Sequence, residues 1–250
     1  MTKLAGVAGQ RPTKRHQIFQ ISLMSALLDG IYDGEMTIEE LLRRGDFGLG
    51  TFNALDGELL VLDGTCFQLN ADGGAHTATI GQRTPFAVVT DFVPHIVAEI
   101  SAPSSQDQVG ALITSLAPSQ NYLYAVRMTG DFQLVRMRTV ARQERPYRPL
   151  VDVTRGEPVV ELTDVSGVFV GFRTPLYERG IGVPGGHLHF IDDQRRRGGH
   201  VLDFVVRRAT LELCLGTDLH LALPLSADFA AAHLDPVDLP AQIEATERHH

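Results

Sequence analysis

Short runs of alternating apolar and polar residues cover most of the chain, and turn signals separate them. In the first half, the runs ELLVL and TCFQL lie among three Asp-Gly pairs, Asp56-Gly57, Asp63-Gly64 and Asp72-Gly73. Asp-Gly suits the tight turns that join antiparallel strands, because both residues tolerate left-handed backbone angles. This part of the chain is therefore predicted to be a meander of short strands.

Two segments have helical spacing instead. In TIEELLRRG, Thr37 and Glu40 stand at capping-box spacing before a short apolar stripe, and a glycine follows where the helix would end. In SSQDQVGALITSLAPS, Ser105 and Gln108 can form the same cap, and a proline stops the helix. One face of this second helix would carry Val109, Leu112, Ile113 and Leu116.

The strand-like pattern returns in NYLYAVRMTGDFQLVRMRTV, which is predicted to be a hairpin around Gly130-Asp131. On the second arm, alternation places the following residues on one side: Phe132, Leu134, Arg136, Arg138 and Val140. Two arginines on a partly apolar face are unusual. One interpretation is that Arg138 points inward and binds an anion. Arg136 fits equally well as a charged residue at the rim of the sheet.

A shift in composition marks the middle of the chain. The stretch ARQERPYRPLVDVTRGEPVVELTDV is rich in Arg, Pro and Glu, and a series of short strand-like runs follows it. We place a domain boundary near residue 150, with one domain over 1–150 and a second over 151–250. The residues alone predict a strand-rich fold with few helices, in which the later strands close a small barrel or form a second sheet.

Composition limits the class of function. With 250 residues, 44% hydrophobic and 21% charged, the chain can bury one large core or two modest ones. A formal net charge of -8 argues against nucleic-acid binding, which needs concentrated positive charge, and favours small-molecule partners. Cys66 and Cys214 are too few for a disulfide framework, and we expect both to be reduced core residues.

Signals for a membrane span or a leader peptide are weak. No stretch approaches the roughly twenty apolar residues that a membrane span needs. The basic N-terminal segment is followed by IFQISLMSALLDG, which polar residues interrupt and which lacks a clean cleavage site. We therefore expect no membrane interaction and a cytoplasmic location.

The segment PGGHLHFIDDQRRRGGHVLDF contains the strongest chemical signal. If HLHFI is extended, His187 and His189 point to one face with Cα atoms about 6.5 to 7 Å apart, so that both imidazoles can converge on one ion. The polar loop then turns the chain, with Gly198 and Gly199 supplying conformational freedom, and the returning arm begins with His200. Three neutral imidazoles leave coordination positions open, as in a catalytic zinc site, and Fe, Co, Ni or Mn would also suit them.

The residues alone leave alternative roles open for these histidines. An H-x-H pair is weak by itself, since histidines at the surface or at a core edge also occur on strand hairpins. A cupin-like metal enzyme or dioxygenase opens with a similar H-x-H, but usually adds a glutamate shortly afterwards, where this chain has Asp193 and Gln194. A non-catalytic barrel that binds a small molecule or a metal would keep the histidines without needing an acid or an arginine.

The histidine segment belongs to a series of motifs that runs through nearly the whole chain: LLDGIYDGEMTIEELLRRGDFGLGTFNALDGEL, RMRTV, GFRTP, GGHLHFIDDQRRRGGHVLDF, LSADF and IEATE. In order and approximate spacing this series resembles the α-acetolactate decarboxylase family. The resemblance implies conversion of 2-acetolactate to acetoin and CO2, with a metal, usually zinc, held by His187, His189 and His200. One departure is Gly186, which stands where members of the family often have tyrosine.

The resemblance also implies roles for residues elsewhere. It places Glu58 in the metal surroundings, together with a C-terminal glutamate that matches Glu247 better than Glu244. It identifies Arg138 with an active-site arginine and puts Thr51 near the pocket. It further implies an α/β fold, with an N-terminal mixed β-sheet and helices, a C-terminal small β-barrel that carries the metal site, and a homodimer.

The expected chemistry explains why these residue types occur together. Loss of CO2 next to a ketone leaves an enediolate, whose negative charge a metal would stabilise as it develops. The substrate is a 2-hydroxy-3-keto acid, so Arg138 would hold its carboxylate or a developing oxyanion. A proton must then reach one face of the enediolate, and the candidates are Glu58, Glu247, or Arg138 through water.

Overall fold

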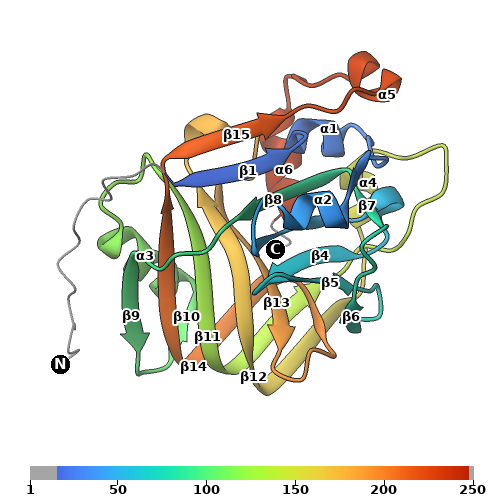
Figure 1. Cartoon of the computed structure of the whole chain (residues 1–250). Helices are drawn as coiled ribbons and strands as arrows, with labels where there is room; N and C mark the ends of the chain where they lie inside the picture. The colour runs from blue at the N-terminus through green and yellow to red at the C-terminus, as the bar shows by residue number, and fades with distance from the viewer. Residues whose placement is uncertain (1–15, 248–250) are drawn as a thin grey trace.

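Two β-sheets packed face to face form most of the structure, a computed structural model that describes residues 16–247 (Figure 1). The first sheet has the strand order β15-β1-β8-β3-β4-β5-β6. Its strands are β1 (Gln17–Ile21), β3 (Phe47–Thr51), β4 (Glu58–Leu62), β5 (Thr65–Leu69), β6 (Ala75–Thr77), β8 (Phe86–Thr90) and β15 (Asp218–Ala222). β1 and β15 run parallel and the other neighbours run antiparallel, so the sheet is mixed.

The second sheet is antiparallel and closes on itself. Its strands are β9 (Ile96–Ile100), β10 (Ser104–Ser105), β11 (Leu123–Arg138), β12 (Val159–Thr174), β13 (Gly185–Asp192) and β14 (Gly198–Gly216). β11, β12, β13 and β14 form a ring, because β13 pairs with β12 and with β14, and β11 joins the other two. β9 and β10 pair with further parts of β14. The sequence predicts a small barrel here, and the structure has a closed antiparallel ring.

The strand-rich α/β fold class expected from the sequence is confirmed. A mixed sheet packs against a ring of strands, and the ring carries the histidine hairpin. The chain crosses between the two layers: β11 belongs to the ring although it precedes residue 150, and β15 returns to the first sheet. The division into residues 1–150 and 151–250 stays a prediction.

Short helices lie around the two sheets (Figure 1). They are α1 (Met24–Leu28), α2 (Ile38–Leu42), α3 (Gln106–Leu116), α4 (Leu150–Thr154), α5 (Ala227–Ala231) and α6 (Leu239–Glu247), with the 3-10 turns η1 (Asn53–Leu55) and η2 (Leu176–Glu178). Both predicted capping boxes are present, with Thr37 capping α2 and Ser105 capping α3. Val109 and Ile113 of α3 are buried against the ring, as the helical spacing predicts. β2 (Met36–Thr37) and β7 (Arg83–Thr84) form a separate pair.

The Asp-Gly turns lie where the sequence predicts them. Asp63 and Gly64 have left-handed backbone angles, φ 49° and 73°, and join β4 to β5. Gly57 and Gly73 also have positive φ, before β4 and between β5 and β6. These turns set where the following strands begin, including β4, which starts at Glu58.

The predicted hairpin around Gly130 is wrong, because β11 runs through this position without interruption. A Cβ on Gly130 would lie 2.2 Å from the carbonyl oxygen of Arg208 in β14, so this glycine permits close strand approach and makes no turn. A register shift follows between Phe132 and Leu134. As a result Phe132 points into the ring and departs from the predicted common face, whereas Arg138 and Val140 line one cavity on the other side, as that prediction requires.

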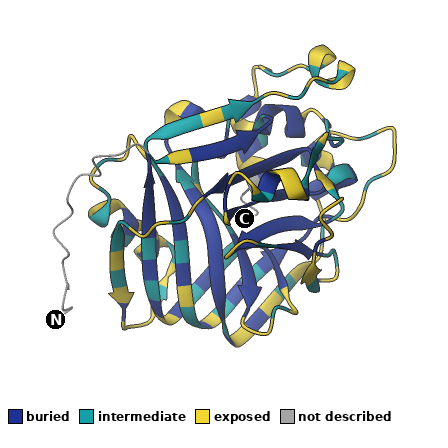
Figure 2. Cartoon of the chain, in the orientation of Figure 1, coloured by how far each residue is buried: buried dark blue, intermediate teal, exposed yellow. Residues whose placement is uncertain are grey.

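Apolar side chains fill three layers, so that central strands such as β3, β4 and β8 are buried along their length (Figure 2). One core lies between the two sheets, a second fills the ring beneath α3, and a third lies between the first sheet and α2. Cys66 and Cys214 are buried and free, as predicted. Among residues 16–247, none of the helices combines the length and the apolar character that a membrane crossing requires.

Candidate metal centre

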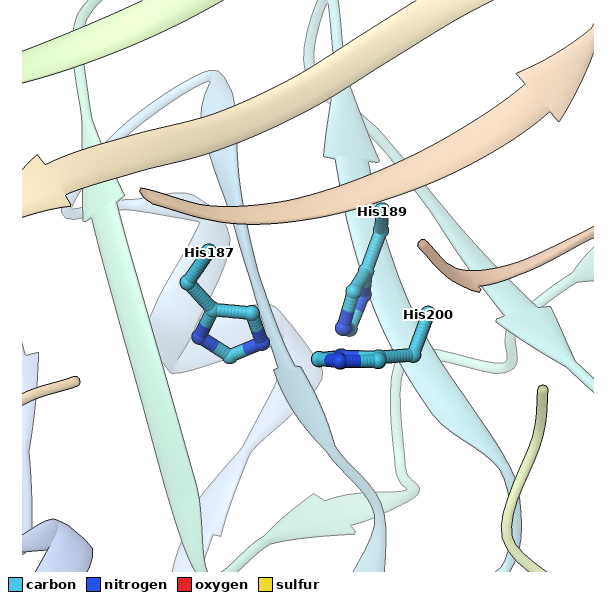
Figure 3. A group of neighbouring side chains, drawn as sticks. All are labelled: His187, His189 and His200. Atoms are coloured by element: carbon cyan, nitrogen blue, oxygen red, sulfur yellow. The ribbon is translucent and has the colours of Figure 1, made fainter. Parts of the chain in front are cut away.

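Three histidines from the two arms of one hairpin meet at the end of the inter-sheet core. Alternation along β13 directs His189 toward the first sheet and sends Phe190 into the ring. His200 of β14 is the direct cross-strand neighbour of His189. One nitrogen from each of His187, His189 and His200 lies within 4.8 Å of the others, and the rings turn toward one another (Figure 3). The group predicted from the sequence can therefore hold a metal ion.

The turn between the two arms differs from the one expected. Its left-handed residue is Arg195, with φ 56°, whereas Gly198 and Gly199 already belong to β14. A Cβ on Gly198 would lie 2.4 Å from the carbonyl oxygen of Phe190, and one on Gly199 would lie 2.7 Å from that of Arg138. These glycines thus let β14 pass close to its two neighbours in the ring, and they supply no turn.

Burial keeps the imidazoles of His187 and His189 neutral. His189 and His200 are 1% and 4% exposed. Burial lowers the pKa of His187 to about 3, with a smaller contribution from the positive charge of Arg138, and burial lowers the pKa of His189 well below its usual value. Neutral imidazole is the form that binds a metal ion, so these ligands need lose no proton at neutral pH.

A hydrogen bond to the first sheet selects the tautomer of His189. Its Nδ1 lies 2.9 Å from the carbonyl oxygen of Leu59 in β4, and because a carbonyl only accepts, Nδ1 carries the proton. Nε2 is then the ligand atom, and it is buried without a hydrogen bond to any described residue. Metal-binding histidines commonly have such a second partner, which fixes the orientation of the ring. The residues present therefore fit a divalent ion.

Glu58 enters the site as the first residue of β4. Its Oε2 lies 3.7 Å from Nε2 of His189, and the residue is 8% exposed. Thr51, directly opposite on β3, donates its hydroxyl proton to the carbonyl oxygen of Gly57 at 2.8 Å. This bond fastens the turn that presents Glu58, so Thr51 lines the cavity but uses its donor on the backbone.

Arg138 reaches the same cavity as the last residue of β11, where it is the cross-strand neighbour of His200. It is 3% exposed, and its Nη2 donates to the backbone carbonyl of Thr246 in α6. Nε and Nη1 are buried and make no hydrogen bond to the residues that the structure describes. Such a guanidinium suits a carboxylate ligand. Arg136 instead forms an ion pair with Glu161 at 3.0 Å.

Two cavities have His200 in common. The inner cavity, of about 40 Å³, is lined by Thr51, Glu58, Arg138 and His187 among others. The outer chamber, of about 800 Å³, opens between α3, the start of β13 and α6, and His200 is part of its wall as well. The inner cavity has room for about three water molecules.

Comparison with known proteins identifies the family. A model of the family described as "Alpha-acetolactate decarboxylase" matches residues 18–236. A protein of that name from Bacillus subtilis (strain 168) is 44% identical over 96% of this chain and 94% of its own length. The chain belongs to the alpha-acetolactate decarboxylase family. A further relative of the same name, from Klebsiella aerogenes, is 44% identical over 98% of this chain and 93% of its own length.

Solved structures of alpha-acetolactate decarboxylases have the same fold. The crystal structure of the Bacillus subtilis strain 168 protein superposes with a TM-score of 0.92 at 44% identity, covering 93% of this chain and 100% of that one. A Staphylococcus aureus protein described as similar to alpha-acetolactate decarboxylase has a TM-score of 0.89 at 32% identity, covering 92% and 100%. The mixed sheet and the closed ring are therefore the architecture of the family.

In this alpha-acetolactate decarboxylase fold, α6 brings the C-terminal segment to the site. Thr246 lines the inner cavity, and its carbonyl holds Arg138. Glu247 follows as the last residue of α6, and its side chain lies outside the described part of the structure. Glu244 is exposed and lines the outer chamber. Glu247 is therefore the sequence neighbour of a residue that lines the inner cavity, whereas Glu244 lines the outer chamber.

Sequence reasoning missed several residues of the site. Leu59 and Thr246 act through backbone carbonyls, which every residue type has, so no sequence signal marks them. Thr154 lines the inner cavity with a buried hydroxyl, although it lies in the Arg- and Pro-rich connection. Gly186, the departure noted in the sequence, has no atom within 4 Å of an added Cβ, so a side chain has room there.

Proposed function

We propose that this protein decarboxylates 2-acetolactate to acetoin and CO2. The observation that carries the proposal is the meeting of three histidines with Glu58 and Arg138 around one cavity, in a chain that belongs to this family. In the reaction the bond from C2 to the carboxylate carbon breaks, its electron pair moves toward the ketone, CO2 leaves, and a proton forms a new C–H bond. Family membership favours this reaction over cupin-like dioxygenase chemistry and over a non-catalytic binding barrel.

His187, His189 and His200 are the residues that would hold a metal ion. Their nitrogen donors suit a divalent transition ion, and the low pKa values of His187 and His189 keep those ligands free for it. When bound, such an ion supplies a Lewis acid for the ketone and hydroxyl oxygens of the substrate, and three imidazoles favour zinc.

Arg138 is the residue that binds the substrate carboxylate. Its contact with Thr246 fixes the guanidinium, and Nε and Nη1 remain for the ligand. The buried position excludes water, which strengthens the contact between opposite charges. Arg138 thereby orients the bond that breaks, because it holds the carboxylate end of that bond in place.

Glu58 is the residue to which we assign proton delivery. Its carboxyl group lies in the inner cavity beside His189, and the turn fastened by Thr51 holds it there. A carboxylic acid fixed on one side of the reacting carbon protonates one face only, which yields acetoin of a single hand. Glu247 is the second candidate, because α6 ends at this cavity.

Racemic 2-acetolactate tests the proposed reaction. The purified protein is mixed with it, and acetoin and CO2 are followed with and without a chelator and after zinc is added back. We expect rapid formation of both products, loss of activity on chelation and recovery with zinc. If the metal-loaded protein forms acetoin no faster than spontaneous breakdown does, the proposed function is wrong.

Two variants test the assigned roles. Arg138→Lys should lower kcat/KM about 100-fold, because an ammonium group lacks the planar array of donors. Glu58→Gln should lower kcat about 100- to 10,000-fold, because the amide cannot deliver the proton. Arg136→Lys and Glu161→Gln are the matched controls, since this ion pair lies outside the inner cavity. A role is contradicted if the variant is as active as its control.

Four finer expectations from the sequence are further proposals. They are zinc as the native ion, a homodimer, a cytoplasmic location, and two domains divided near residue 150. Metal analysis of the purified protein addresses the first, and light scattering in solution addresses the second. Cell fractionation and limited proteolysis address the other two.

A further inference from the structure

An arginine with an unused buried donor lines the outer chamber. Arg173 lies near the end of β12, and its Nη1 is buried without a hydrogen bond to any described residue. Arg127, another partly buried arginine of the ring, differs because it contacts Glu212 through two bonds of 2.6 and 3.0 Å. A guanidinium stays charged at physiological pH, so a buried and unused N–H of this kind calls for an anionic acceptor.

The same arginine lies next to the histidine hairpin. In the ladder between β12 and β13, Arg173 is the direct neighbour of Gly186, and Phe172 is the neighbour of His187. Gly186 has no side chain, and a Cβ added there would have no atom within 4 Å. The space beside Arg173 is therefore open at this position. The chamber wall continues to His200, which also lines the inner cavity. Alternation turns Arg173 to the side of the ladder opposite to His187, so the chamber that it lines meets the histidines at His200.

The overall charge of the protein opposes the entry of an anion. The chain has a formal net charge of -8. The chamber wall contains two exposed carboxylates, Asp107 and Glu244, and one further arginine, the exposed Arg179. A positive group in a cleft raises the local concentration of anions and their rate of association, and a partly desolvated group does so more strongly.

We propose that Arg173 is a docking residue, which binds the carboxylate of the incoming substrate in the outer chamber before the substrate moves past His200 to Arg138. The inference rests on the proposed decarboxylation. The outer chamber, of about 800 Å³, shares His200 with the inner cavity, so it offers the substrate a place beside the histidines. Arg173 selects small hydroxy-keto carboxylates at entry, and Arg138 holds the same group for the reaction.

Substitution of Arg173 in the zinc-loaded enzyme tests this role. Arg173→Gln should lower kcat/KM about 10- to 100-fold, as expected for the loss of a charge-assisted hydrogen bond, and leave kcat within about 2-fold. Arg173→Lys should recover part of the loss, because it keeps the charge. Raising the salt concentration from about 20 to 300 mM should lower kcat/KM of the parent enzyme and have little effect on Arg173→Gln.

Arg179→Gln is the matched control, since this arginine lines the same chamber but is exposed. A second measurement is the association rate of a substrate analogue whose ketone is reduced to an alcohol, which cannot decarboxylate. Arg173→Gln should bind it more slowly, and Arg179→Gln should bind it as fast as the parent does. If Arg173→Gln does not fold, the association rate of Arg173→Lys decides, with slower binding than in the parent expected because an ammonium is only a point charge.

Three results would overturn the docking role. They are an unchanged kcat/KM in Arg173→Gln, an equal loss in Arg179→Gln, and a loss confined to kcat, which would place Arg173 in the chemical step. A parent enzyme that forms no acetoin would instead overturn the proposed function, so the two failures are distinguishable.

Discussion

Replacing Gly171 with alanine would test how the ring positions the metal ligands without changing any of them. Gly171 lies in β12 opposite Leu188, between the ladder pairs that hold His187 and His189. A Cβ there would lie 2.0 Å from the carbonyl oxygen of His187 and 2.7 Å from Cδ2 of Leu188. Ordinary van der Waals contact begins at 3.4 Å, so β12 and β13 must separate by about 1.4 Å at this point.

A shift of this size is large for a metal site. Ligand distances in such sites hold to within about 0.2 Å, so a displaced His187 binds the ion poorly. We expect the affinity for zinc to fall about 10- to 100-fold, as when an orienting contact of a ligand is lost. Overpacking should also lower the free energy of unfolding by about 1–3 kcal/mol. Decarboxylation should be weak at limiting zinc and recover in excess zinc, because all three ligands remain.

Competition with a chelator of known affinity measures zinc binding, and circular dichroism with thermal unfolding checks the fold. Gly186→Ala is the matched control, because it adds the same methyl group next to His187 at a position where the Cβ meets no atom within 4 Å. It should bind zinc as the parent does. The reasoning is refuted if folded Gly171→Ala binds zinc as tightly as the parent, or if Gly186→Ala loses as much affinity.

Three further predictions concern the rest of the molecule. Phe169→Ala, in the aromatic cluster of the ring, should lower the free energy of unfolding by about 3–5 kcal/mol in chemical denaturation, and a much smaller loss would contradict tight packing there. Burial raises the pKa of the Cys66 thiol to about 12 and that of Cys214 to about 11, so both should resist alkylation at about pH 8 until the protein unfolds. The raised pKa values favour the folded protein fully below the pKa of the unfolded thiols, and this contribution to the free energy of unfolding is lost as the pH rises through the pKa of the folded thiols. Rapid labelling of the native protein at about pH 8 would contradict the prediction. Glu212→Gln should lower the free energy of unfolding by about 1–2 kcal/mol, because Arg127 loses its negatively charged partner and one of its two acceptor oxygens, and a double-mutant cycle with Arg127→Met checks that the loss belongs to this pair.

Features that depend on neighbouring residues could be predicted from the sequence. The capping boxes of α2 and α3 join residues three positions apart, and the turn at Asp63-Gly64 needs two residues that accept positive φ. The common face of His187 and His189 follows from strand alternation alone. These predictions were correct because local backbone geometry decides them, whatever the rest of the chain does.

Features that depend on distant strands could not be predicted in the same way. Gly130 has the sequence context of a turn, yet it lies within β11, because only a glycine lets β14 approach so closely. The irregular pairing after it moves Phe132 and Arg138 to different sides. Gly198 and Gly199 are explained by the same kind of close approach.

The residue types of the site, the spacing of the histidines and the family to which the motifs belong all follow from the amino-acid order. How those residues act together depends on the packing of the folded chain: Leu59 selects the tautomer of His189, Thr246 holds Arg138, and His200 lines both cavities. These contacts join positions far apart in the chain, largely through backbone carbonyls. Because a carbonyl is the same in every residue, its partner is set only when the two sheets pack together.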